Sequence, residues 1–178
     1  MITTLDHLII AVDDLDKAEK DYTKIFGIQP VWKGEHKELG TTNSLFNFQN
    51  TYFELLSASG EGLGAMLVQQ ALEESGEGLI GMVLGTDNIE EATQTLKKSF
   101  LISEPGAGTG TNFKSDEVRK WKNLFLPPEL TRGIFSFIIQ QESLNQFEKF
   151  SIWMVREFRI YFAFLGSVKF RNLTEEQN

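Results

Sequence analysis

A histidine and a glutamate stand out because each lies in an otherwise apolar, strand-like run. His7 occurs in LDHLIIAV, residues 5–12, and Glu54 occurs in TYFELLSA, residues 51–58. An imidazole nitrogen and a carboxylate oxygen are both suitable ligands for zinc, nickel, manganese or iron(II). The same two groups can also transfer protons, with the carboxylate orienting the imidazole. The pair therefore indicates either a metal site or a metal-free acid–base site.

Strand periodicity predicts that both side chains face away from the helix-covered side of their strands. Successive side chains of a strand point to opposite faces. His7 lies on one face of its run, and the other face is continuously apolar, formed by Leu8, Ile10 and Val12. Glu54 likewise shares a face with Tyr52, opposite Phe53 and Leu55. Each strand thus offers one polar group to a common concave surface.

The elements that position these residues occur twice in the chain. Residues 5–27 read as a strand, a break at Asp13–Asp14 and an amphipathic helix that ends at Gly27. Residues 78–100, GLIGMVLGTDNIEEATQTLKKSF, repeat this order, with Asp87 in the place of Asp13. Asp14 is predicted to cap the first helix, because its carboxylate can accept from exposed amide groups.

Three strand-like runs follow each predicted helix, at 29–33, 42–48 and 51–58 in the first half and at 101–103, 117–126 and 134–141 in the second. A short helix is expected at 60–75, GEGLGAMLVQQALEES. We therefore predict an α+β domain over residues 1–145. It contains module one (1–60), a helical linker (61–77) and module two (78–142), each module with the order βαβββ. An apolar, basic tail (146–178) follows.

Two segments together, LDHLIIAVDDLDKAEKDY and TTNSLFNFQNTYFELLS, resemble the first module of a glyoxalase-like domain of the vicinal oxygen chelate superfamily. The later runs GLIGMVLGTDNIEEATQTLKK and KWKNLFLPPELTRGIFSFIIQQE resemble its second module, so the resemblance spans residues 1–142. It implies a curved, partly open, barrel-like mixed sheet with helices outside and a ligand site in the concavity. Members include glyoxalases, extradiol dioxygenases, epimerases, fosfomycin-resistance transferases and drug-binding resistance proteins. The resemblance therefore predicts the fold, but it leaves several classes of function open.

The resemblance implies two alternative functions. One is a divalent-metal-dependent lyase, isomerase or dioxygenase that acts on a small oxygenated metabolite with His7 and Glu54 as metal and catalytic residues. The other is a metal-free protein that binds or sequesters a small molecule. Further metal ligands would come from module two, where the repeat places Gly81 and Ile139 at the equivalent positions. Neither side chain can bind zinc, nickel, manganese or iron, although Gln140, Gln141 and Glu142 follow closely.

Several other residues are candidates for ligand contacts: Tyr52, Asn43, Trp121, Arg119 and Gln141. Arg119 or Trp121 on the concave side would favour an anionic or an aromatic ligand. His36, in the polar stretch GEHKELG, is expected to be a solvated loop histidine. The glycines of PGAGTGTN, residues 105–112, are expected to form a mobile loop at the rim of the cleft.

Composition excludes several classes of protein. The chain has no cysteine, which excludes disulfides, thiolate zinc sites and cysteine nucleophiles. A net charge of −8 argues against a general nucleic-acid binder. The N-terminus shows no signal peptide, and the apolar run at 160–168 is too short to span a bilayer. We expect a cytoplasmic protein that binds a small molecule rather than nucleic acid or a membrane. The tail could add a pair of strands to the core, form a swapped element in a homodimer or be the start of a further module.

Overall fold

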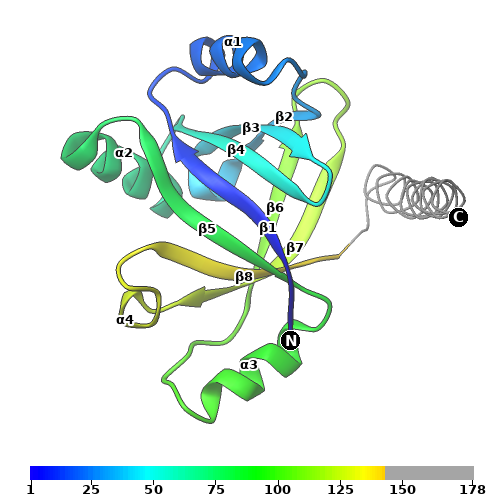
Figure 1. Ribbon diagram of the computed structural model, residues 1–178, viewed down its shortest axis with the longest axis vertical. Helices are drawn as coiled ribbons and strands as arrows, with labels where there is room; N and C mark the ends of the chain where they lie inside the picture. The colour runs from blue at the N-terminus through cyan, green and yellow to red at the C-terminus, as the bar shows by residue number, and fades with distance from the viewer. Residues whose placement is uncertain (143–178) are drawn as a thin grey trace, which may run out of the picture. The chain divides into compact units, whose positions relative to one another are not determined.

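The computed structural model describes residues 1–142. Their strands form one mixed sheet that closes into a barrel in the order β1-β4-β3-β2-β6-β7-β8-β5 (Figure 1). The strands are β1 (Ile2–Ala11), β2 (Trp32–His36), β3 (Thr41–Phe48), β4 (Thr51–Ala58), β5 (Gly78–Thr86), β6 (Gly106–Asn112), β7 (Val118–Leu126) and β8 (Phe135–Gln141). The helices are α1 (Leu15–Phe26), the 3-10 helix η1 (Lys37–Leu39), α2 (Leu63–Ser75), α3 (Ile89–Lys97) and α4 (Pro128–Thr131). The α+β fold of paired modules is confirmed.

The pairing of the strands shows the internal repeat. Strand β1 runs parallel to β4, and its counterpart β5 runs parallel to β8. Antiparallel pairs β1–β5 and β2–β6 then join the two modules, and these joints close the barrel that the sequence predicts as partly open. Side chains of alternate residues therefore line a common interior, as expected for strands of a barrel.

Both helices of the repeat begin at a capping side chain, and the sequence predicts the first of these two caps, Asp14. The Asp14 carboxylate accepts a hydrogen bond from the Lys17 amide at 2.9 Å, and α1 ends at Gly27 with a left-handed φ of 69°. The Asn88 side chain caps α3 in the same way, accepting from the Glu91 amide at 3.0 Å. Local chain chemistry thus fixes where each helix starts.

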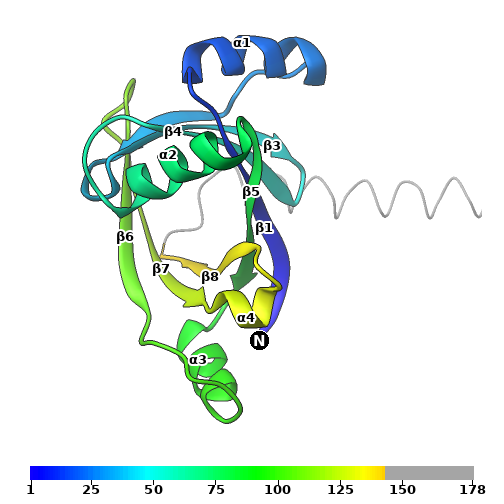
Figure 2. The same cartoon turned by 90° about the vertical axis from the view of Figure 1, so that its left-hand side faces the viewer.

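Each outer helix covers its own apolar core, and a third core fills the barrel. Leu15 and Ala18 of α1 pack on Phe46 and Leu55, whereas α3 packs on a separate cluster around Leu124. The two helices lie at opposite ends of the barrel domain in both views (Figures 1 and 2). Val68 of α2 joins the interior cluster of β1, β4, β5 and β8, and Ala71 and Leu72 pack against it. None of the described helices is long and apolar enough to cross a membrane.

The structure corrects two expectations about the strands. Residues 101–103 are not a strand, and Leu101 is 97% exposed. The glycine-rich stretch expected as a mobile loop is instead strand β6. Its pairing with β7 sets Gly108 opposite Trp121 and Gly106 opposite Asn123. Glycine is needed there because those larger side chains lie against the strand, so the absence of side chains is a packing feature and not a sign of mobility.

Candidate functional site

The two residues singled out by type and spacing meet inside the barrel. In the parallel pair of β1 and β4, Glu54 lies opposite Ile9, two residues beyond His7. This register brings His7 Nε2 within 3.2 Å of Glu54 Oε2. On the other side of the ring, His7 Nδ1 lies 2.6 Å from Asp6 Oδ1. One imidazole is therefore held between two carboxylates.

Burial and charge determine the protonation of this pair. The side chains of His7 and Glu54 are only 12% and 7% exposed. Burial alone would lower the pKa of His7, but the hydrogen bonds and charges of Asp6 and Glu54 outweigh it and raise that pKa to about 9. Burial would raise the pKa of Glu54, but the bonded, charged His7 lowers it. At neutral pH the pair is an imidazolium and a carboxylate.

Asn43 holds the second oxygen of Glu54 in place. Its Nδ2 donates to Glu54 Oε1 at 2.6 Å, and its Oδ1 accepts from the Trp32 indole N–H at 3.2 Å. Because an indole can only donate, this contact fixes which way the amide points. Asn43 is 3% exposed, so its amide serves the carboxylate rather than a solvent-facing surface.

The expectation that His36 is a solvated loop histidine is wrong. His36 is the last residue of β2, and alternation directs it inward with Trp32 and Gly34. Its Nε2 lies 3.4 Å from Asn43 Nδ2, and its Nδ1 lies 3.0 Å from Thr41 Oγ1. Burial lowers the pKa of His36, and the charge of His7 adds to this effect against the opposing charge of Glu54.

The hydrogen-bond directions then define the tautomer of His36. Because the Asn43 amide nitrogen is a donor, His36 Nε2 must accept, and its proton resides on Nδ1 facing Thr41. His7 is therefore charged while His36 is neutral. A polar chain, Asp6–His7–Glu54–Asn43–His36, crosses the interior. A sequence signal for His36 does exist. The alternation of inward residues that starts at Trp32 continues through Gly34 to His36, although the stretch GEHKELG is polar.

Module two supplies no matching pair. The position equivalent to His7 is Gly81, as the repeat predicts. Glu54 pairs with the residue two positions after His7, so its equivalent in module two is the partner of Val83, which is Phe137. The expected equivalent of Glu54, Ile139, is displaced by two residues and belongs to the interior core. The Phe137 ring instead packs edge-on against His7, with ring centroids 6.0 Å apart.

The donor set does not fit a resident catalytic metal. Such sites usually have three protein ligands and an open position, and within residues 1–142 no three His, Cys, Asp or Glu side chains form a group that could hold an ion. Gln140 does not complete the set, because its Oε1 accepts from the Ile89 amide at the start of α3. Glu142, which directly follows β8, is exposed.

The remaining candidates lie on the inner faces of neighbouring strands. Arg119 places its guanidinium carbon 4.3 Å from the centroid of the Trp32 ring. Trp121 meets His36 edge-on, with centroids 5.6 Å apart. Gln141 pairs with Trp121 across β7 and β8, and Tyr52 pairs with His7 across β1 and β4. These contacts bring the sequence-predicted ligand residues into the same barrel interior.

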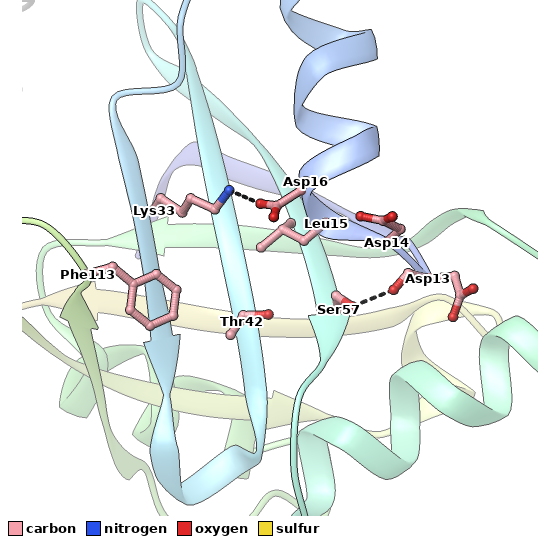
Figure 3. Close-up of a pocket in the computed structure, with 8 residues that line it drawn as sticks. All are labelled: Asp13, Asp14, Leu15, Asp16, Lys33, Thr42, Ser57 and Phe113. Atoms are coloured by element: carbon pink, nitrogen blue, oxygen red, sulfur yellow. Dashed lines mark hydrogen bonds and ion pairs between the residues drawn. The ribbon is translucent and has the colours of Figure 1, made fainter.

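A separate pocket lies on the outer side of the sheet, beside the first turn of α1 (Figure 3). Its volume is about 360 Å³, and it is lined by Asp13, Asp14, Leu15, Asp16, Lys33, Thr42, Ser57 and Phe113. The Lys33 ammonium pairs with Asp16 and, at 3.1 Å, with Glu19. The lining carries three aspartates and one lysine and is therefore acidic, and none of these residues belongs to the polar chain inside the barrel.

A barrel of paired βαβββ modules, with a histidine and a carboxylate facing each other inside, is the architecture of the vicinal oxygen chelate superfamily. The chain belongs to the glyoxalase-like domain family, whose model matches residues 5–152. A search of curated proteins gave no match.

Solved structures show the same fold at low sequence identity. A methylmalonyl-CoA epimerase from Streptomyces coelicolor, in complex with 2-nitronate-propionyl-CoA, is 19% identical with a TM-score of 0.61. The match covers 80% of this chain and 100% of that one. The Mycobacterium tuberculosis methylmalonyl-CoA epimerase is 18% identical with a TM-score of 0.63, covering 80% and 90%. A hypothetical protein from Bacillus halodurans is 20% identical with a TM-score of 0.64, covering 80% and 97%.

Proposed function

We propose that the His7–Glu54 pair moves a proton on a small carbonyl metabolite without a catalytic metal, as an isomerase-type enzyme does. The observation that carries the proposal is the contact between His7 Nε2 and Glu54 Oε2 inside a barrel whose second module offers Gly81 and Phe137. Neighbouring titratable groups with pKa values pushed apart are typical of acid–base sites. The epimerase neighbours agree with this class, but at 18–19% identity they support the fold alone.

The chemistry follows from breaking one ion pair. A carbonyl oxygen that accepts from His7 Nε2–H takes the place of Glu54 Oε2 on that proton. Losing its cationic partner raises the pKa of Glu54, so the carboxylate becomes a stronger base. Glu54 can then remove the proton next to the carbonyl, while the imidazolium stabilises the enolate oxygen that forms. Asn43 keeps Oε1 fixed, so Oε2 faces the substrate.

Deuterium exchange tests this proposal. The protein in D₂O is incubated with a panel of 2-oxo acids, 1,3-dicarbonyl compounds and methylmalonyl-CoA, and loss of the α-proton signal is followed by NMR. We expect catalysed exchange for at least one compound, reduced about 100-fold or more in His7→Gln and in Glu54→Gln. Glu35→Gln, on the outer side of β2, is the matched control and should retain full activity. Equal exchange by all variants, or none by the native protein, contradicts the proposal.

A second candidate is a metal-free binding or sequestering protein. It is favoured by the same ion pair, because His7 and Glu54 already satisfy each other without a substrate. Saturable binding of a panel compound with no exchange of its α-proton would identify this function.

A further inference from the structure

Strand β1 is irregular at the residue before His7. In the antiparallel pair of β1 and β5, Leu5 lies opposite Leu84, and His7 lies opposite Val83. Asp6 is therefore an extra residue in β1, a β-bulge, which bends the strand and changes the direction of its side chains. Adjacent side chains of a regular strand point to opposite faces. At the bulge the Asp6 carboxylate instead reaches His7 Nδ1, 2.6 Å away.

Contacts with both neighbouring strands hold the bulge. The Asp6 carbonyl accepts a hydrogen bond from the Thr51 hydroxyl of β4 at 3.1 Å. On β5, Gly85 lies opposite Thr4, where a Cβ atom would come within 2.3 Å of the Thr4 hydroxyl. Glycine at that position leaves room for the irregular strand, so the contact between Asp6 and His7 is supported by the pairing of three strands.

The two carboxylates occupy different sides of the imidazole. Glu54 faces Nε2 from β4, and the Phe137 ring packs edge-on from β8. Asp6 faces Nδ1, and its side chain is only 12% exposed. In the proposed reaction the substrate carbonyl replaces Glu54 at Nε2, so the contact at Nδ1 is the one that persists.

Replacing Glu54 by a neutral carbonyl removes one charged partner from a buried cation. With no other counter-ion, desolvation would favour transfer of the His7 proton to Glu54, which would leave both groups neutral. A protonated Glu54 cannot act as a base, and a neutral imidazole stabilises an enolate less than an imidazolium does. A carboxylate at Nδ1 opposes this transfer, because the imidazolium keeps a charged partner on its other ring nitrogen.

We propose that Asp6 is the positioning residue of the His7–Glu54 pair: it holds the Nδ1 proton of His7 and remains the counter-ion of the ring when a substrate carbonyl displaces Glu54. This inference rests on the proposed function and adds a third residue to it. Asp6 does not touch the substrate. It acts through His7, by directing Nε2–H to the carbonyl oxygen and by leaving Glu54 unprotonated.

Heteronuclear NMR of the histidine rings, which distinguishes protonated from unprotonated nitrogens, tests the Asp6 contact without a substrate. Above the pH at which His7 becomes neutral, we expect its remaining proton on Nδ1 in the native protein and in Glu54→Gln. In Asp6→Ala the proton should move to Nε2, where Glu54 accepts it. His36, whose proton lies on Nδ1 facing Thr41, is the internal reference, and unchanged His36 signals show that the variant has folded.

The kinetics of α-proton exchange test the charge of Asp6. Asp6→Asn keeps a hydrogen-bond acceptor for Nδ1 but removes the charge. With a panel compound that the native protein exchanges, we expect Asp6→Asn to lower kcat about 10- to 100-fold, as for other carboxylates that orient a histidine. KM should stay within about threefold of the native value, because Asp6 makes no contact with the substrate. Asp116→Asn, in the exposed loop between β6 and β7, is the control and should retain full activity.

The outcomes separate the role of Asp6 from the proposed function. Retention of the proton on Nδ1 in Asp6→Ala, or an unchanged kcat in Asp6→Asn, would overturn the role of Asp6 and leave the proposed function in place. Equal losses of kcat in Asp6→Asn and Asp116→Asn would also overturn it. No exchange by the native protein with any panel compound contradicts the proposed function, and the ring spectra then decide whether Asp6 holds the His7 proton.

Discussion

His7 has its pKa set by two carboxylates, and His36 has its pKa set by burial. The two imidazoles belong to one hydrogen-bonded chain and are joined through Glu54 and Asn43. Their protonation states differ because only His7 touches a carboxylate directly. The presence of two histidines in the sequence does not reveal this difference in protonation, because the neighbouring atoms in the folded protein determine each pKa.

The raised pKa of His7 makes the stability of the protein depend on pH. Because that pKa rises from 6.5 to about 9 on folding, its stabilising contribution is complete below pH 6.5 and is lost as pH rises through 9. We expect the free energy of unfolding, from urea denaturation, to fall by about 1–3 kcal/mol more between pH 6.5 and 9.5 in the native protein than in His7→Gln.

The other histidine provides the matched control for this measurement. The pKa of His36 is lowered, so its titration affects stability only below pH 6.5. His36→Gln should therefore keep the native decline above pH 7. Identical slopes for the native protein and His7→Gln would show that His7 is not held as an imidazolium.

At the scale of elements, a helix, strand or side-chain orientation could be predicted from the sequence where the contacts that determine it are local. The helix caps Asp14 and Asn88 act within three residues, and the alternation that orients His7 and Glu54 acts along one strand. Strand β6 could not be predicted this way, because the reason for its glycines lies on another strand. The same is true of the displaced equivalent of Glu54, which depends on the register between β5 and β8.

Gly108 shows how a contact between strands can be tested. We expect Gly108→Ala to lower the free energy of unfolding by about 1–3 kcal/mol, because the added methyl group overlaps the Trp121 indole. Gly78→Ala is the control, since a Cβ atom there meets nothing within 4 Å. Adding Trp121→Phe to Gly108→Ala should restore part of the loss in urea denaturation. Equal effects of the two alanine substitutions would show that β6 does not support the indole.

At the scale of the whole molecule, the repeat gives a near-symmetric scaffold with asymmetric chemistry. Module one directs a histidine and a carboxylate into the barrel, and module two directs Gly81 and Phe137 to the equivalent places. A side chain at Gly81 would be crowded, because a Cβ atom there would lie 3.0 Å from the Phe135 ring and from the Phe135 carbonyl oxygen. Phe137 is different, because it already projects a large side chain beside His7. The tail beyond residue 142, including its expected strand or dimer contact, lies outside the described residues.

This asymmetry predicts that one substitution would convert the pair into a metal site. The native protein offers two ligands, one of them protonated, so we expect only weak binding of zinc, nickel, manganese or iron(II) after chelator treatment. Phe137→Glu adds a third ligand on the strand equivalent to that of Glu54 and should tighten zinc binding at least 10-fold in isothermal titration. Phe125→Glu, placed on the neighbouring ring 5.4 Å from Phe137, is the control and should bind no more tightly than the native protein. Submicromolar zinc binding by the native protein would contradict the metal-free site, because His7 and Glu54 would then be part of a complete ligand set.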